Sequence, residues 1–161
     1  MTNEILTAET PGEGKPTIYT LGYTGWKIDD VAATLDRLDA VLVDVRMVPR
    51  SRNPIWNSTA LAKRFGERYI WLRQFGNKNY KGTFEQIEIV DFAAGAHRLL
   101  ELFPPKPGSI VPGKPIILFC GCKDVSQCHR KVLAAHLAAG TTTIDLVPQP
   151  AAITTALPTL F

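Results

Sequence analysis

Two short and almost wholly apolar runs constrain the fold of this chain most strongly. Val41–Val45 contains a single acidic residue, and Ile116–Cys120 contains no charged residue. Strands with one face in water alternate apolar and polar residues, whereas parallel strands covered by helices on both faces read as continuous apolar runs. The two runs therefore predict buried strands of a parallel sheet, which places the chain among α/β proteins.

The segments around these runs alternate between strand and helix patterns. Further strands are predicted at 17–22, 69–73 and 142–147. Helices are predicted at about 28–38, 58–65, 84–103 and 126–139, the first from apolar residues at i, i+3, i+4 and i+7. With right-handed connections, this order predicts a Rossmann-like three-layer α/β sandwich with a mainly parallel sheet of four to five strands.

The chain has 161 residues, which predicts a single α/β domain over 17–147. Residues 1–16 contain two prolines, two glycines and few apolar residues, and predict a flexible N-terminal tail. Residues 148–161 are apolar but contain three prolines, and predict a Pro-rich C-terminal tail.

Composition also bears on the compartment. No apolar run approaches the roughly 20 residues of a membrane helix, and the N-terminus lacks the basic and apolar regions of a secretory signal. The three cysteines are an odd number, which argues against a secreted disulfide framework. We therefore expect a cytoplasmic protein without a membrane partner.

Positive charge is concentrated in one part of the chain. Residues 44–81 contain nine basic and two acidic residues, a formal charge of +7 in a chain whose net charge is +3. Aromatic residues are interleaved with this charge, which is typical of a phosphate-bearing partner, although a solvated basic face gives the same pattern. Trp56 and Tyr80 lie on predicted loops and are expected to face a ligand. Trp71 lies within a predicted strand and is expected in the core.

Polar residues follow the predicted strand ends, where α/β folds place their ligand crevice. Asp44 and Arg46 are two residues apart, so they share a strand face if the strand continues through both. They are expected to form either a structural ion pair or a functional pair. A clamp for an anion is predicted from the arginines near these ends, whose planar guanidinium groups suit phosphate. Its members are Arg46, Arg50, Arg52 and Arg130.

All three cysteines and one histidine fall between Cys120 and His129. Cys128 is predicted in the first helical turn, where unpaired N–H groups and a neighbouring arginine lower a thiol's pKa. Adjacent helical residues point about 100° apart, so Cys128 and His129 are not expected to form a dyad. Cys120 is expected in the core and Cys122 is expected to be the most exposed thiol; a purely packing role for Cys128 remains open.

The same residues bear on metals and cofactors. Three cysteines and His129 suit zinc by type, but spacings of one, five and zero intervening residues are not a usual structural-zinc pattern. No metal is therefore predicted. No cofactor is predicted either, because the chain has neither a dinucleotide fingerprint nor a phosphate-loop motif.

Several ordered motifs carry a family resemblance. They are Thr20-Leu-Gly-Tyr-Thr24, Val43-Asp-Val-Arg46, Pro49-Arg-Ser-Arg52 followed by Asn57, and Cys120 leading to Cys128-His-Arg130. With them, residues 17–139 closely resemble the domain of unknown function 488 family. The resemblance implies a Rossmann-like sandwich in a cytoplasmic bacterial or archaeal protein, and it implies no activity. Many relatives read Gly-His-Ser where this chain has Gly22-Tyr23-Thr24, so no histidine role at that turn is carried over.

The function predicted first is an enzyme that acts on a phosphorylated or nucleotide-like substrate. Its predicted catalytic residues are Cys128, His129 and Asp44. Its predicted anion- and substrate-binding residues are Arg46, Arg50, Arg52, Arg130, Tyr23, Thr24, Cys122, Trp56 and Tyr80. The alternative is a non-catalytic nucleic-acid-binding or accessory module, whose binding would weaken with salt.

Overall fold

The structure is a computed structural model that describes residues 18–82, 84–138 and 142–148. Five strands of this part form a single parallel sheet in the order β3-β2-β4-β1-β5. The strands are β1 (Ile18–Gly22), β2 (Val41–Asp44), β3 (Tyr69–Trp71), β4 (Ile116–Cys120) and β5 (Thr143–Leu146). The predicted α/β class with a parallel sheet is confirmed. The predicted tails lie outside the described residues, apart from Pro148.

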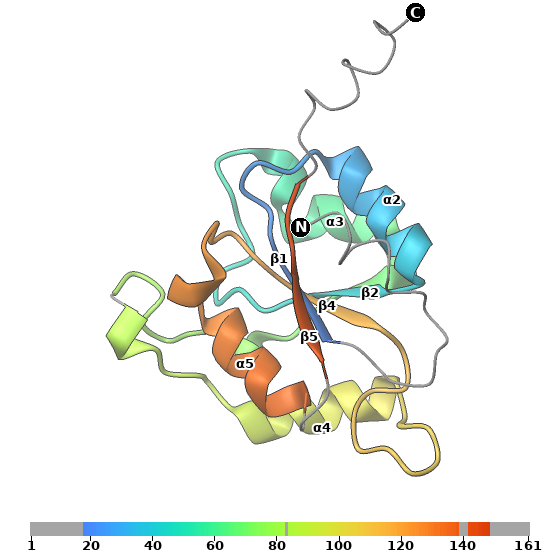
Figure 1. Cartoon of the computed structure of the whole chain (residues 1–161). Coiled ribbons are helices and arrows are strands. Elements are labelled where there is room, and N and C mark those ends of the chain that lie inside the picture. The colour runs from blue at the N-terminus through green and yellow to red at the C-terminus, as the bar shows by residue number, and fades with distance from the viewer. Residues whose placement is uncertain (1–17, 83, 139–141, 149–161) are drawn as a thin grey trace, which may run out of the picture.

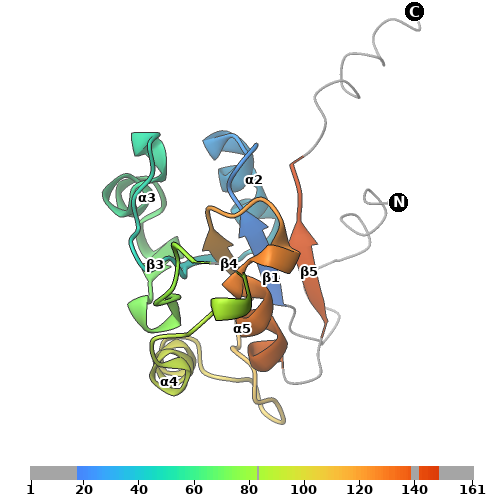
Figure 2. The same ribbon diagram turned by 90° about the vertical axis from the view of Figure 1, so that its left-hand side faces the viewer.

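Four α-helices of the described residues cover the sheet on both faces. They are α2 (Ile28–Leu38), α3 (Ser58–Phe65), α4 (Phe92–Leu102) and α5 (His129–Ala138). Figure 2 shows α2 and α3 on one side of the sheet and α4 and α5 on the other. None of these helices is long and apolar enough to cross a membrane.

Each face of the sheet contributes to its own buried cluster, because successive strand residues point to opposite faces. In β4, Ile117 and Phe119 pack in the cluster that contains the apolar residues of α2 and α3. Ile116 and Leu118 pack in the cluster of α4 and α5. The continuous apolar run of β4 is therefore explained by two dry faces.

The connections diverge at the carboxyl ends of the central strands (Figure 1). The chain leaves β2 toward α3 on one face, whereas it leaves neighbouring β4 toward α5 on the other. Such a switch in direction opens a crevice at the strand ends. The register places Asp44 opposite Phe119, and Gly22 opposite Cys120, so the polar residues that follow these strands gather there.

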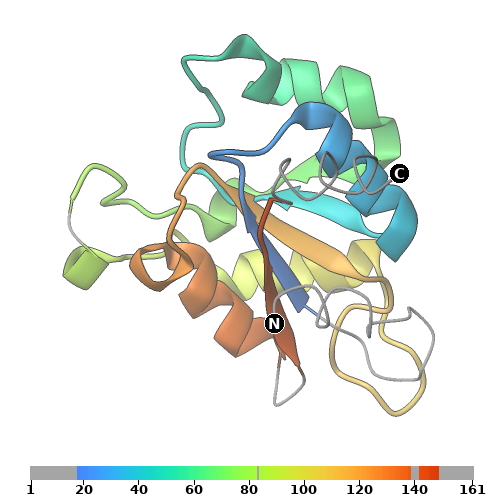
Figure 3. The same cartoon turned by 45° about the horizontal axis from the view of Figure 1, so that its top comes forward.

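The helix predicted at 84–103 is shorter than expected. A 3₁₀ turn occupies Phe84–Gln86, and α4 begins only at Phe92. The backbone of 88–90 pairs instead with 76–78: Lys78 N donates to Glu88 O at 2.7 Å, and the side chain of Asn77 accepts from Glu88 N at 2.9 Å. These bonds hold the segment extended, so it projects beside the start of α5 (Figure 3).

We expect replacement of Asp91 by alanine to lower the free energy of unfolding by about 1 kcal/mol, the usual value of an N-cap. The Asp91 carboxylate accepts from Ala94 N at 3.0 Å at the start of α4. Asp91→Asn is the matched control, because asparagine caps equally well and should leave stability nearly unchanged. Urea unfolding of both variants is the measurement, and equal losses would show that the cap is not what stabilises α4.

Candidate functional site

A cavity of about 580 Å³ lies at the carboxyl ends of β2 and β4. Its walls come from the segments that follow β1, β2 and β4 and from the connection between β3 and α4. Two arginines, Arg46 and Arg50, line it, and the described lining residues include no carboxylate. The cavity therefore combines positive charge with three thiols and an imidazole.

Arg46 is held at the cavity by a buried carboxylate. The two oxygens of Asp44 accept from Arg46 Nε at 2.9 Å and from Nη2 at 2.6 Å. The Tyr69 hydroxyl donates to the same carboxylate at 2.6 Å. Asp44 is fully buried and does not line the cavity, so it positions Arg46. The predicted ion pair is confirmed, although β2 ends at Asp44 and Arg46 lies beyond the strand.

This network shifts two acid–base equilibria. Burial and the Asp44 charge raise the pKa of the Tyr69 hydroxyl, which keeps it a neutral donor. Burial opposes the charge on Arg46, but the bond to Asp44 outweighs it and raises the pKa of the guanidinium.

One end of the Arg46 guanidinium has no acceptor. Its Nη1 is buried and lacks a hydrogen-bond partner among the described residues. The guanidinium lies 5.1 Å from the Phe119 ring centre and 5.6 Å from that of Tyr23. A buried donor without an acceptor is costly, and an anion in the cavity is the kind of partner that would satisfy it.

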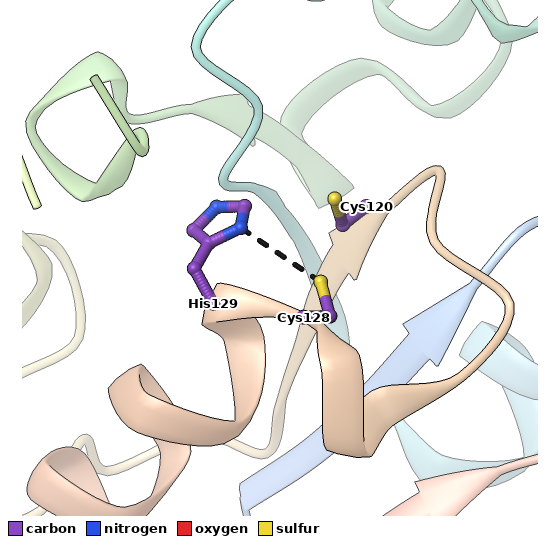
Figure 4. Close-up of side chains that lie close together, drawn as sticks. All are labelled: Cys120, Cys128 and His129. Carbon is purple, nitrogen blue, oxygen red and sulfur yellow. Dashed lines mark hydrogen bonds between the residues drawn. The ribbon is translucent and has the colours of Figure 1, made fainter. Parts of the chain in front are cut away.

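Cys120, Cys128 and His129 point toward one another at the edge of the same cavity (Figure 4). Cys120 ends β4, and Cys128 precedes α5, with extended backbone angles of φ −123° and ψ 144°. The prediction that the helix begins near Ser126 is wrong, because a 3₁₀ turn occupies Val125–Gln127.

The extended backbone at Cys128 changes where its side chain points. Because Cys128 lies outside the helix, its Sγ comes within 3.8 Å of Nδ1 of His129. The expectation that the two residues diverge by a helical angle is therefore wrong. The other imidazole nitrogen, Nε2, lies 2.7 Å from the carbonyl oxygen of Val45, the residue that follows β2.

The thiols share hydrogen bonds that set their acidity. Bonds from Cys122 and Cys128, with His129 adding to them, lower the pKa of Cys120 well below the usual thiol value. The same bonds raise the pKa of Cys128 and of Cys122. Burial disfavours the charged form of His129, but Cys120 outweighs burial and raises the pKa of the imidazole. The prediction of a lowered pKa at Cys128 is therefore wrong, since the thiolate is favoured at Cys120.

Arg130 does not join the predicted clamp. It is fully buried, donates to Cys122 O at 2.7 Å and pairs with Asp145 at 3.4 Å. Thr24 does not line the cavity either, because its hydroxyl donates to Gly121 O at 2.7 Å. Both side chains instead donate to carbonyl oxygens of the loop after β4.

The remaining predicted binding residues divide into two groups. Tyr23, Cys122, Arg50 and Tyr80 line the cavity, and Tyr80 is half exposed. Arg52 is exposed but does not line it. Of the four arginines predicted to form a clamp, Arg46 and Arg50 line the cavity.

The burial of both tryptophans differs from the prediction. Trp56 is buried and stacks on Tyr23 with ring centres 4.8 Å apart, so the ligand-facing position predicted for it is wrong. Trp71 is 40% exposed on the edge strand β3, so its predicted core position is also wrong. Its Nε1 donates to Arg46 O at 2.8 Å, which fixes the backbone behind the cavity.

Among the residues of the site that the sequence analysis did not predict are Tyr69, Asn77 and Cys120. Tyr69 holds Asp44, Asn77 lines the cavity, and Cys120 lies at the centre of the thiol cluster. Cys120 is buried, as predicted, and also lines the cavity, because a residue at a strand end has one side in the core and one at the crevice. The alternation of residue types around Tyr69 does not predict its bond to Asp44, which is 25 residues away in the sequence.

Residues 27–98 match the family model described as Domain of unknown function DUF488. The matched part includes Asp44, Arg46 and Tyr69, and it ends before the segment that carries the three cysteines. None of the curated proteins and none of the solved structures matches the chain.

Proposed function

Because this chain belongs, through residues 27–98, to the domain of unknown function 488 family, whose name assigns no activity, we propose its function from its own site. The protein is an enzyme that acts on a phosphorylated or nucleotide-like small molecule. The phosphate lies at Arg46 and Arg50, and the reacting group lies at Cys120, Cys128 and His129. Asp44 acts by positioning Arg46.

The observation that carries this proposal is the state of Arg46. An arginine that is 6% exposed has two of its donors on Asp44 and a third, Nη1, without an acceptor in the described residues. Because the carboxylate fixes the plane of the guanidinium, the group is preorganised for an anion in the cavity. Arg50 lines the same cavity and adds a second positive charge.

An enzyme is favoured over a simple anion binder because reactive groups share the cavity. Thiols and an imidazole are the common nucleophiles and proton carriers of active sites. Cys128 is 1% exposed and His129 is 6% exposed, and both still line the cavity. A bound molecule would therefore contact them where little water reaches them.

The alternative of a nucleic-acid-binding module receives less support. Of the nine basic residues in 44–81, four form ion pairs: Arg46 with Asp44, Arg64 with Asp29, Arg68 with Asp36, and Lys78 with Glu88. These pairs reduce the free positive charge available to a phosphate backbone. Of the other five basic residues, only Arg50 lines the cavity, where it lies with Arg46; so small a cluster suits the phosphate of a small molecule.

The proposed compartment is the cytoplasm. All three cysteines are free thiols, and the Sγ atoms of Cys120 and Cys122 lie 3.9 Å apart. Thiols so close together stay reduced more readily in a reducing compartment than in an oxidising one.

We expect Arg50→Ala to weaken the binding of pyrophosphate about tenfold, because a hydrogen bond to a charged group contributes about 1.5 kcal/mol or more. Isothermal titration at low salt with pyrophosphate as the probe is the measurement. Arg52→Ala is the matched control, because it removes an exposed arginine two residues away that does not line the cavity.

Equal weakening by Arg50→Ala and Arg52→Ala would contradict the cavity as the anion site. Tight binding of single-stranded DNA with a steep salt dependence and no binding of pyrophosphate would favour the nucleic-acid module. For the enzymatic part, a panel of phosphate esters and nucleotides should include a substrate whose turnover is lost in Cys128→Ser. Turnover unaffected by that change would contradict the placement of the reacting group of the substrate at Cys120, Cys128 and His129.

A further inference from the structure

We propose that Cys120, Cys128 and His129 bind a thiophilic divalent metal ion of the zinc class, with a fourth coordination position open to the cavity. The spacing of these residues is not a usual structural-zinc pattern, but the extended backbone at Cys128 brings its sulfur atom close to Nδ1 of His129. Metal binding by these residues stands independently of the proposed function. Only the role of the ion at the reacting end of the cavity rests on that function.

The three ligand atoms already lie close to the separations that a metal site needs. They all lie within 4.8 Å of one another, and Cys128 Sγ is 3.8 Å from His129 Nδ1. Zinc binds sulfur at about 2.3 Å and nitrogen at about 2.0–2.1 Å, so neighbouring ligands of a tetrahedral site lie roughly 3.5–3.8 Å apart. Side-chain shifts of about 1 Å or less therefore complete the site.

The imidazole is oriented as a ligand by its second nitrogen. Nε2 of His129 lies 2.7 Å from the Val45 carbonyl, which can only accept, so Nε2 carries the proton. In the neutral ring the lone pair is then on Nδ1, which faces the sulfur atoms. A carbonyl that fixes the outer N–H is the usual support of a metal-binding histidine.

The chemistry of the donors selects the class of ion. Two thiolates and an imidazole are soft or borderline ligands, which favour zinc and similar ions over magnesium and calcium. The grouping contains no carboxylate. Cys120, Cys128 and His129 are buried, and all three line the cavity, so an ion there would face the cavity on its fourth side. Three protein ligands with an open position are typical of catalytic zinc.

Substitution of Cys122 tests whether the fourth coordination position of the ion is open. Its Sγ lies 3.9 Å from Cys120 Sγ, but it is exposed on the loop after β4 and is not part of the closely spaced group. We therefore expect Cys122→Ser to retain the ion. Loss of binding in this variant equal to that in Cys128→Ser would overturn the open position.

The test is titration of the full-length, reduced and chelator-treated protein with Co²⁺, followed by its thiolate charge-transfer and visible bands. We expect a single ion per chain with tetrahedral cobalt bands, displaced by Zn²⁺. Cys128→Ser and His129→Ala should lose these bands, and His97→Ala, which removes an exposed histidine, should keep them. A Zn²⁺-dependent rise in the thermal midpoint of the unchanged chain provides a second measurement that does not depend on the folding of any variant.

Octahedral cobalt bands, the absence of binding to the unchanged chain, or binding lost in His97→Ala and kept in Cys128→Ser would each overturn the metal site. The Arg50→Ala variant separates the two proposals. It should bind Co²⁺ as the unchanged chain does while pyrophosphate binding falls. Retained cobalt binding with unaltered pyrophosphate binding would contradict the proposed function and leave the metal site standing.

Discussion

Replacing Asp44 with alanine should lower the free energy of unfolding by about 3–5 kcal/mol, the cost of breaking a buried ion pair from one side. Asp44 is fully buried and Arg46 is 6% exposed, so the change leaves a guanidinium in the interior without its carboxylate. The Tyr69 hydroxyl would lose its acceptor as well. The expected loss is a large fraction of the stability of an ordinary domain.

Urea unfolding measures this loss, and Asp29→Ala is the matched control. Asp29 pairs with Arg64 at 2.7 Å, a distance similar to that of the buried pair, but both partners are exposed. Exposed pairs contribute about 0–1 kcal/mol, so the control should be nearly neutral. Losses of similar size in the two variants would show that Arg46 finds other partners once Asp44 is removed.

Replacing Gly22 with alanine should displace the loop after β4 and lower the free energy of unfolding by about 1–3 kcal/mol or more, as overpacking does. A Cβ at position 22 would lie 1.7 Å from the Cys122 carbonyl oxygen and 2.9 Å from Arg130 Nη1. The first of these atoms belongs to the backbone, so no side-chain rotation relieves the overlap. The loop must move, and the bond from Arg130 to Cys122 must lengthen or break.

Gly121→Ala is the matched control for this variant. A Cβ at position 121 would meet the Tyr23 side chain at 3.1–3.2 Å, which a small ring movement relieves. Thermal unfolding should therefore show a clearly larger loss for Gly22→Ala than for Gly121→Ala. Cobalt binding should weaken in the first variant as well, because the displaced loop carries Cys128 away from Cys120. Equal stability and equal cobalt binding in both variants would contradict the close contact between β1 and this loop.

The sequence predicted the layers of the fold and the edge of the sheet that carries the site. Runs such as Ile116–Cys120 report burial on two faces, and strand ends follow directly from where such runs stop. The exact start of α5 could not be read in this way, because a 3₁₀ turn and a helix share local composition. Because α5 begins a few residues later than predicted, Cys128 lies outside the helix and its side chain points toward His129.

The wrong predictions of burial for Trp56 and Trp71 have a different cause. Alternation in a strand does not reveal whether the strand is central, and β3 lies at the edge of the sheet, where Trp71 is partly exposed. Trp56 follows Pro54 in a short 3₁₀ turn that Asn53 caps at its start. The turn folds the ring onto Tyr23, a contact between segments far apart in sequence that local patterns do not contain.

The residues at and just after the end of β2 fix the relative positions of the Arg46 guanidinium and the His129 imidazole. The Val45 carbonyl holds His129, and the next residue, Arg46, carries the guanidinium that lines the cavity. Because Asp44 fixes the guanidinium and the Val45 carbonyl fixes the imidazole, the interval between the two groups is set by hydrogen bonds to adjacent residues of the chain. A molecule that engages both must match that interval, so selection among phosphorylated compounds should depend on how far the reacting group lies from the phosphate.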